Sequence, residues 1–102
     1  MDNINFIVAE LIKEYCTDDP FEIANELGIG TIISPLGKII GNYTVINDSK
    51  VFFINSNLSE VNKNIVCSAL LGNVIIYSNL FAIFFDFNFD EPIEKFIKEL
   101  LK

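Results

Sequence analysis

The side chains that most often perform chemistry in proteins are scarce in this sequence. Its 102 residues include no His, so the commonest general base and the commonest zinc ligand are both absent. Without His, neither a Ser nor a Cys nucleophile has its usual basic partner. The basic residues are seven Lys and no Arg, against 14 carboxylates. These counts indicate a protein that is not an enzyme, and we expect no bound metal and no other cofactor.

The remaining reactive groups have ordinary structural explanations. Asp86 and Asp90 could form a carboxylate pair for acid–base chemistry or Mg²⁺ binding, but a solvated strand face accounts for them better. Cys16 and Cys67 lack metal-ligand spacing, and Cys67 is predicted to be a small core residue. The stretch 28–30, Gly-Ile-Gly, indicates the end of a helix, because no strand leads into it as in a dinucleotide-binding motif.

The composition predicts one folded domain, residues 1–102. Apolar residues make up 51% of the chain and ten residues are Phe, which is ample material for a core. The formal charge of -7 opposes direct binding to nucleic acid and to anionic membranes, since both carry negative phosphates. The first ten residues lack the basic region of a signal peptide, and no apolar stretch is long enough to span a membrane. We therefore expect a cytoplasmic protein.

Apolar periodicity predicts about four helices. Asp19 and Pro20 suit the N-cap and the first position of the second helix, and Glu22 stands where a capping-box acid belongs. The third helix is apolar almost all round from Ile65 onward, which is typical of a helix buried in the middle of a domain. The predicted helices are residues 3–15, a short helix from 20 to 27, a helix from about 59 to 77, and a last helix from 91 onward.

Three segments rich in β-branched and aromatic residues predict strands: 31–33, 39–46 and 51–54. The sequences between them, 34–37 and 47–50, are turn-like. Two hairpin connections in a row favour an antiparallel meander. The chain is therefore predicted to be an α+β domain, a small antiparallel three-stranded sheet packed with about four helices.

A further segment between the third and fourth helices is unusually rich in Phe. From Phe85 to Asp90 Phe alternates with Asp or Asn, which is typical of a half-buried strand, and we expect a strand over Phe81–Phe89. We expect about half of the Phe side chains to fill the core beside residues 69 and 70, and the rest to form an edge or an apolar patch on the surface. The five are Phe81, Phe84, Phe85, Phe87 and Phe89.

Several short segments follow one another in a specific order. They are Leu11–Ile12, Asp19–Ala24, Glu26–Ile29, Leu36–Gly37, Gly41–Tyr43, Phe53–Glu60 and Val66–Cys67. In this order they resemble the ImmA/IrrE family of zinc peptidases, over roughly residues 7–76. The resemblance implies a zincin-like core.

In that family the active-site helix carries His-Glu-x-x-His, in which two His hold zinc and the Glu acts on the zinc-bound water. Aligned on Val66–Cys67, this chain has Ala69 for the first His, Leu70 for the Glu and Asn73 for the second His. The family's further acidic ligand falls on Pro92, and its acidic neighbours cannot rebuild a three-ligand site. The resemblance therefore implies a catalytically inactive relative that has kept the scaffold.

The resemblance and the acidic charge together suggest a protein that acts by contact with another protein. Active members of the family act on repressors in mobile elements and stress regulation. A shortened, inactive relative is predicted to be a phage or mobile-element inhibitor, for example anti-CRISPR-like, or a regulator. The expected partner is a protein with a basic, nucleic-acid-binding surface. The predicted partner-binding residues are Phe85, Asp86, Phe87, Phe89, Asp90, Glu91 and Glu94.

Two other functions stay open on the sequence. One is a hydrolase with an altered metal site, which stoichiometric zinc or iron in the purified protein would favour. The other is a structural homodimer with no outside partner, which the mass in solution would reveal.

Overall fold

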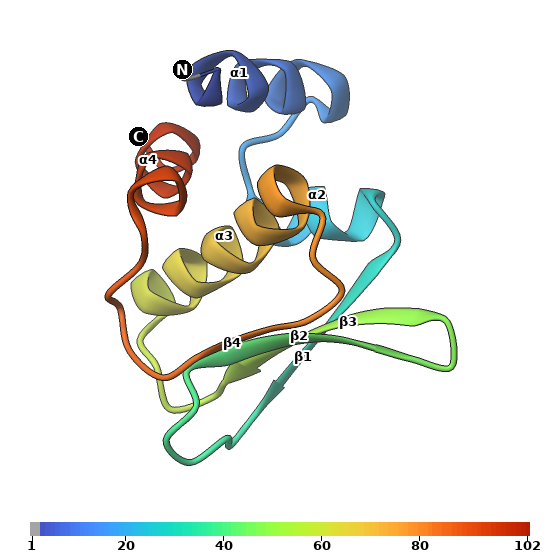
Figure 1. The fold of residues 1–102 in the computed structure, drawn as a ribbon, viewed down its shortest axis with the longest axis vertical. Helices are drawn as coiled ribbons and strands as arrows, with labels where there is room; N and C mark the ends of the chain where they lie inside the picture. Colours follow the sequence, from blue (N-terminus) through green and yellow to red (C-terminus); the bar gives the residue numbers. More distant parts are fainter. Residues whose placement is uncertain (1–2) are drawn as a thin grey trace.

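The computed structural model describes residues 3–102, which form four helices and one four-stranded sheet (Figure 1). The elements are α1 (Ile4–Tyr15), α2 (Pro20–Glu26), β1 (Ile29–Ser34), β2 (Gly41–Ile46), β3 (Ser49–Asn55), α3 (Glu60–Tyr77), β4 (Ala82–Phe84) and α4 (Glu91–Leu100). The predicted α+β class and the number of helices are confirmed. Met1 and Asp2, which belong to the N-terminal segment that we expect not to be a signal peptide, lie outside the described residues.

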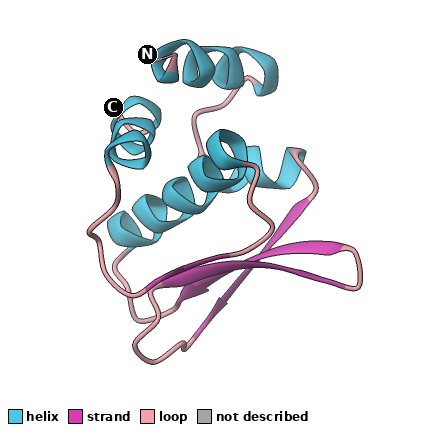
Figure 2. Cartoon of the chain, in the orientation of Figure 1, coloured by secondary structure: helices cyan, strands magenta, loops and turns pink. Residues whose placement is uncertain are grey.

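The helices all lie on one side of the sheet (Figure 2). α2 and α3 contact the strands, while α1 and α4 pack farther out, with α4 against both α3 and α1. The opposite face of the sheet is covered by no helix in the part of the chain that is described. Within residues 3–102, none of the helices combines the length and the apolar character needed to cross a lipid bilayer.

The helix starts follow from local capping. The Asp19 carboxylate accepts a hydrogen bond from the amide of Phe21, and Pro20 occupies the first turn of α2, as the sequence predicts. Glu22 does not complete a capping box, because its carboxylate accepts a hydrogen bond from the Thr17 hydroxyl instead. At α3 the Ser59 hydroxyl accepts from the amide of Asn62, 3.1 Å away.

The predicted antiparallel meander is wrong. The strand order is β1-β3-β2-β4, and β1 pairs with β3 in parallel. Only the β2–β3 pair, joined at the tight turn Asn47–Asp48, is the predicted hairpin. The β2–β4 pair is also antiparallel, so the sheet is mixed and has four strands.

Asn55, at the end of β3, explains why β3 lies between β1 and β2. Its buried side chain donates hydrogen bonds to the carbonyls of Gly37 (3.1 Å) and Ile39 (2.9 Å), both in the connection from β1 to β2. Its backbone amide donates to the carbonyl of Ile40, and the next amide, of Ser56, donates to that of Ser34. These bonds hold the β1–β2 connection across the end of β3. β1 and β2 therefore lie on either side of β3, each one strand spacing away from it.

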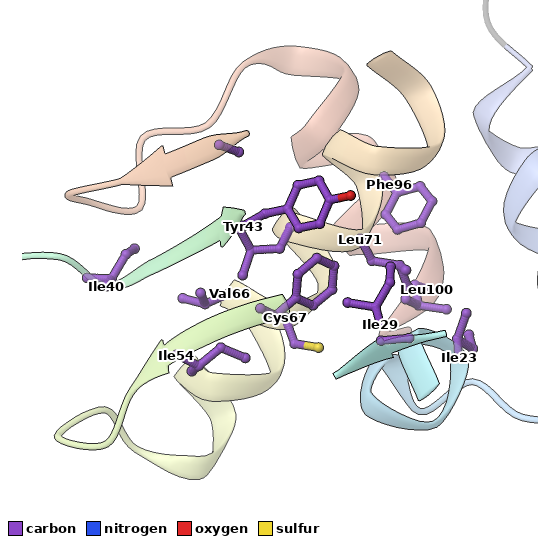
Figure 3. Close-up of a cluster of buried hydrophobic side chains, with 14 of the residues drawn as sticks. Ile23, Ile29, Ile40, Tyr43, Ile54, Val66, Cys67, Leu71, Phe96 and Leu100 are labelled. Atoms are coloured by element: carbon purple, nitrogen blue, oxygen red, sulfur yellow. The ribbon is translucent and has the colours of Figure 1, made fainter. Parts of the chain in front are cut away.

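The core lies between α3 and the sheet, with side chains from α2, α4 and the strands converging on α3 (Figure 3). Residues 66–73 of α3 are buried, which confirms the predicted central helix, although its last turn is partly exposed. α3 approaches β2 closely at Gly41, where a Cβ atom would lie 2.4 Å from a methyl of Val66. Cys67 is fully buried here, and burial raises the pKa of its thiol, so it is the core residue that was predicted.

The strand predicted over Phe81–Phe89 is present only in its first part. β4 covers Ala82–Phe84, and the chain then bends, so the half-buried strand expected from Phe85 onward does not form. The Asp86 carboxylate accepts a hydrogen bond from the amide of Asn88, 3.0 Å away, and the Asp90 carboxylate caps α4. These short side-chain-to-backbone bonds offer the backbone an alternative to strand pairing, so alternation alone was a misleading signal.

Candidate protein-binding surface

Packed side chains occupy the three α3 positions that we aligned with the His-Glu-x-x-His motif of the peptidases. Ala69 and Leu70 are fully buried: Ala69 packs in a cluster with Ile93 and Ile97 of α4, and Leu70 packs in the main core. The amide oxygen of Asn73 accepts a hydrogen bond from the amide of the Asn79 side chain at 2.6 Å.

This set of side chains does not fit a zinc ion. A methyl group and an isobutyl group offer no electron pair, and the amide oxygen that remains is already bonded. In residues 3–102, no three His, Cys, Asp or Glu side chains lie together as a group that could hold a metal.

The Phe side chains after α3 divide into a packed set and an exposed set. Phe84 and Phe89 pack against the Ala69 cluster and contact each other edge to face, with ring centroids 5.0 Å apart. Phe81, Phe85 and Phe87 are 57%, 60% and 38% exposed. Two of the five thus fill the space beside Ala69, which agrees with the expectation that about half would enter the core.

A hollow of about 380 Å³ lies between the end of this segment and α4, and we call it the Phe87 hollow. Phe87 and Phe89 form part of its wall, in edge-to-face contact at 6.2 Å between ring centroids. Glu94 and Lys98 add one charge of each sign. The hollow can accept an apolar side chain whose neighbours are charged. It is lined by Asn62, Ile65, Phe87, Phe89, Glu94, Ile97 and Lys98.

The other predicted partner-binding residues lie outside this hollow. Phe85 and Asp86 are exposed on the bend that precedes it. Glu91 is exposed and lines a second hollow, of about 570 Å³, between α1, α3 and α4. Since Glu91 and Glu94 are one helical turn apart, α4 still presents both carboxylates near each other.

Asp90 has a structural role. One carboxylate oxygen accepts a hydrogen bond from the amide of Ile93 at 3.0 Å and so caps α4, and the other accepts from the hydroxyl of Tyr77 at 2.9 Å. Burial and the neighbouring Asp90 carboxylate raise the pKa of Tyr77, so the phenol keeps the proton that it donates. Asp90 therefore joins the end of α3 to the start of α4.

Replacing Asp90 with Ala should lower the free energy of unfolding by about 1–2 kcal/mol, because an N-cap is lost together with the Tyr77 bond. Tyr77→Phe removes only the second bond and should cost about half as much. Urea unfolding of the purified variants measures both. Asp18→Ala is the control, since it removes the same charge from an exposed side chain. Equal losses for Asp90→Ala and Asp18→Ala would contradict the capping role.

Sequence reasoning missed the exposed apolar residues outside this segment. Phe6 on α1 is two-thirds exposed, and Ile32 and Ile33 on β1 are 45% exposed. Phe6 lies on the opposite side of α1 from the apolar residues Ile4, Val8 and Leu11, so the helical period of the sequence already indicates that it is exposed. The exposure of Ile32 and Ile33 depends on which strand lies at the edge of the sheet, and the sequence does not carry that information.

The chain is 36% identical over 75 residues to a protein of Bacillus phage phi105 that is named uncharacterized immunity region protein 2. The match covers 72% of this chain and 48% of the phage protein, so the chain spans about half the length of that relative. No protein-family model matches the chain, and no solved structure matches it. The similarity is therefore to a phage protein, while the ImmA/IrrE resemblance and the zincin-like core stay interpretations of the sequence.

Proposed function

We propose that this chain is a non-catalytic regulator or inhibitor from a phage or mobile element, and that it acts by binding another protein. The observation that carries the proposal is the packing of α3. Where the peptidases it resembles place their ligands and general base, this chain has Ala69 and Leu70 in the core and Asn73 bonded to Asn79. Packed in this way, these three positions offer neither metal ligands nor a general base, which supports a function without hydrolysis.

The regulatory part of the proposal is supported by similarity. The phage phi105 relative is named for an immunity region. A role in the control of a phage or another mobile element is the function that this similarity favours for the present chain. The partner would then be a repressor or another nucleic-acid-binding complex, including the effector complexes that anti-CRISPR proteins block.

The binding surface that we propose is the Phe87 hollow with its flanks, the exposed Phe85 and the carboxylates of Glu91 and Glu94. Aromatic side chains are enriched at protein interfaces, and exposed ones near a hollow are suited to anchor a partner. The formal charge of -7 would favour encounter with a basic surface. Asp86 lies beside this surface, whereas Asp90 contributes by holding α4 in place.

The test is affinity capture from the native host with matched pairs of variants. Phe87→Ser and the double variant Glu91→Lys/Glu94→Lys alter the proposed surface. Phe6→Ser and Glu10→Lys/Glu14→Lys make the same chemical changes on α1. We expect the surface variants to recover at least about tenfold less partner than the wild-type chain, which corresponds to about 1.4 kcal/mol of binding free energy. The α1 variants should bind as the wild type does.

Three results would overturn the proposal. Equal losses for the two sets of variants would show that the effect is not local to the Phe87 hollow. Cleavage of the captured partner, detected by mass spectrometry, would favour the hydrolase. A chain that captures no protein and has twice its formula mass in solution would favour the structural homodimer.

A further inference from the structure

The two edges of the sheet differ in how well they are protected. The β4 edge has only three residues, and the chain turns away directly after it, at Phe85 and Asp86. The β1 edge has six residues, and no charged residue occurs between Leu27 and Gly37. Natural proteins usually shorten an exposed edge, place charges on it or bend it, because an open edge pairs with other strands. β1 has none of these protections along its length.

The backbone groups on the open side of β1 can be assigned. The carbonyl of Ser34 accepts a hydrogen bond from the amide of Ser56, so Ser34 directs its backbone groups toward β3. Because these groups alternate along a strand, Ile29, Thr31 and Ile33 direct theirs away from β3. No described residue bonds to the outward groups of Thr31 and Ile33. A second strand laid along β1 would supply hydrogen-bond partners for these outward N–H and C=O groups.

We propose that β1 pairs antiparallel with β1 of a second copy of this chain, about a two-fold axis at Thr31. In this register Thr31 faces Thr31 of the copy, and Ile29 faces Ile33 in both directions. All three outward residues then exchange both backbone hydrogen bonds with their opposites, about six bonds in total. Shifting the register in one direction brings Pro35, which has no N–H, opposite Ile29. The two four-stranded sheets become one continuous sheet.

The side chains favour a second copy over an unrelated strand. On the face of the sheet away from the helices, Ile32 of each copy lies opposite Gly30 of the other in this register. A Cβ atom at Gly30 would have only the carbonyl of Lys50 nearby, at 3.9 Å, so the site has open space for the Ile side chain. The same pairing covers Ile33, which is 45% exposed in one copy. The edge is therefore complementary to itself in shape as well as in hydrogen bonding.

Charge determines how this pairing should respond to salt. Two copies that each carry a formal charge of -7 repel each other at a distance, although the paired edge is neutral. Salt screens that repulsion within about 10 Å at 0.1 M and within less at higher concentration. Self-association through β1 should therefore strengthen as salt is added.

The first experiment measures mass in solution by light scattering or sedimentation over a range of protein concentrations. We expect the wild-type chain to reach twice its formula mass of 11.5 kDa. Thr31→Pro removes only an outward N–H, which an edge strand tolerates, and should give a folded monomer. Ile33→Lys places a charge on the same edge and should also give a monomer. Ile83→Lys, the same change on the β4 edge, should leave the dimer intact. Circular dichroism confirms that each variant is folded.

The second experiment tests the register by oxidative cross-linking in a Cys16→Ser background, in which Cys67 is buried. Thr31→Cys should give a disulfide-linked dimer, because opposed residues that exchange hydrogen bonds have Cα atoms about 5.5 Å apart. Ile33→Cys should not, since its opposite is Ile29. A wild-type chain that stays monomeric at all concentrations would overturn the proposal. So would a dimer that survives Thr31→Pro and Ile33→Lys, a dimer lost with Ile83→Lys, or cross-linking at position 33 and not at 31.

Discussion

Replacing Leu70 with Glu is expected to leave the protein unfolded at neutral pH. Our interpretation of the sequence aligns position 70 with the catalytic Glu of the ImmA/IrrE peptidases, but Leu70 is fully buried in the core, beside the close contact of α3 with Gly41. An unpaired buried carboxylate costs several kcal/mol, against a total stability of about 5–15 kcal/mol for an ordinary domain. The far-ultraviolet circular dichroism spectrum and urea unfolding measure the outcome.

Two controls separate the charge from the change of shape. Leu70→Met conserves volume and should cost less than about 1.5 kcal/mol. Leu70→Gln is polar without an ionisable group, so its stability should not follow the titration of a carboxyl. Burial raises the pKa of a carboxyl introduced at position 70 above its unfolded value of about 4.3. Leu70→Glu should therefore be most stable below that pH and lose stability as the pH rises toward the raised pKa.

A well-folded Leu70→Glu protein at neutral pH, as stable as Leu70→Met, would show that position 70 borders an open site. It would remove the observation on which the non-catalytic function rests. It would leave the pairing of β1 untouched, because that proposal depends on the opposite face and the edge of the sheet.

Replacing Asn55 with Asp is the second change with a large expected effect, a loss of about 3 kcal/mol or more in the free energy of unfolding. The Asn55 amide nitrogen donates to the carbonyls of Gly37 and Ile39, and the residue is only 4% exposed. A carboxylate has no donor at neutral pH, so two bonds become contacts between oxygen atoms in a buried place. Urea unfolding at pH 7 gives the magnitude.

Asn57→Asp is the matched control, because it makes the same chemical change at an exposed side chain two residues away, and its effect should stay within about 0.5 kcal/mol. Asn55→Ala removes the donors without adding a charge and should lie between the two. If Asn55→Asp and Asn57→Asp proved equally mild, Asn55 would not be what holds the β1–β2 connection across the end of β3.

The helices could be predicted from the sequence because their signals are local. The side chains of Asp19 and Ser59 cap helices by accepting hydrogen bonds from amides two and three residues later. The apolar residues between 91 and 101 recur with the helical period, which is also visible within a short stretch of sequence. The placement of Ala69 and Leu70 in the core also follows from the helix in which they occur, since that helix is apolar almost all round.

The strand order and the surface were decided by contacts between distant residues. β1, β2 and β3 occupy the expected segments. The side chain of Asn55, however, bonds to a connection 16 and 18 residues earlier, and β3 therefore lies between β1 and β2, which a meander would have made neighbours. That order leaves β1 at an open edge. Likewise, Phe alternation over residues 85–90 predicts a strand, while the Asp86 turn and the Asp90 cap, which also bonds to Tyr77, bend the chain. Periodicity records which residues prefer burial, whereas hydrogen bonds between separated segments choose which of several equally periodic arrangements forms.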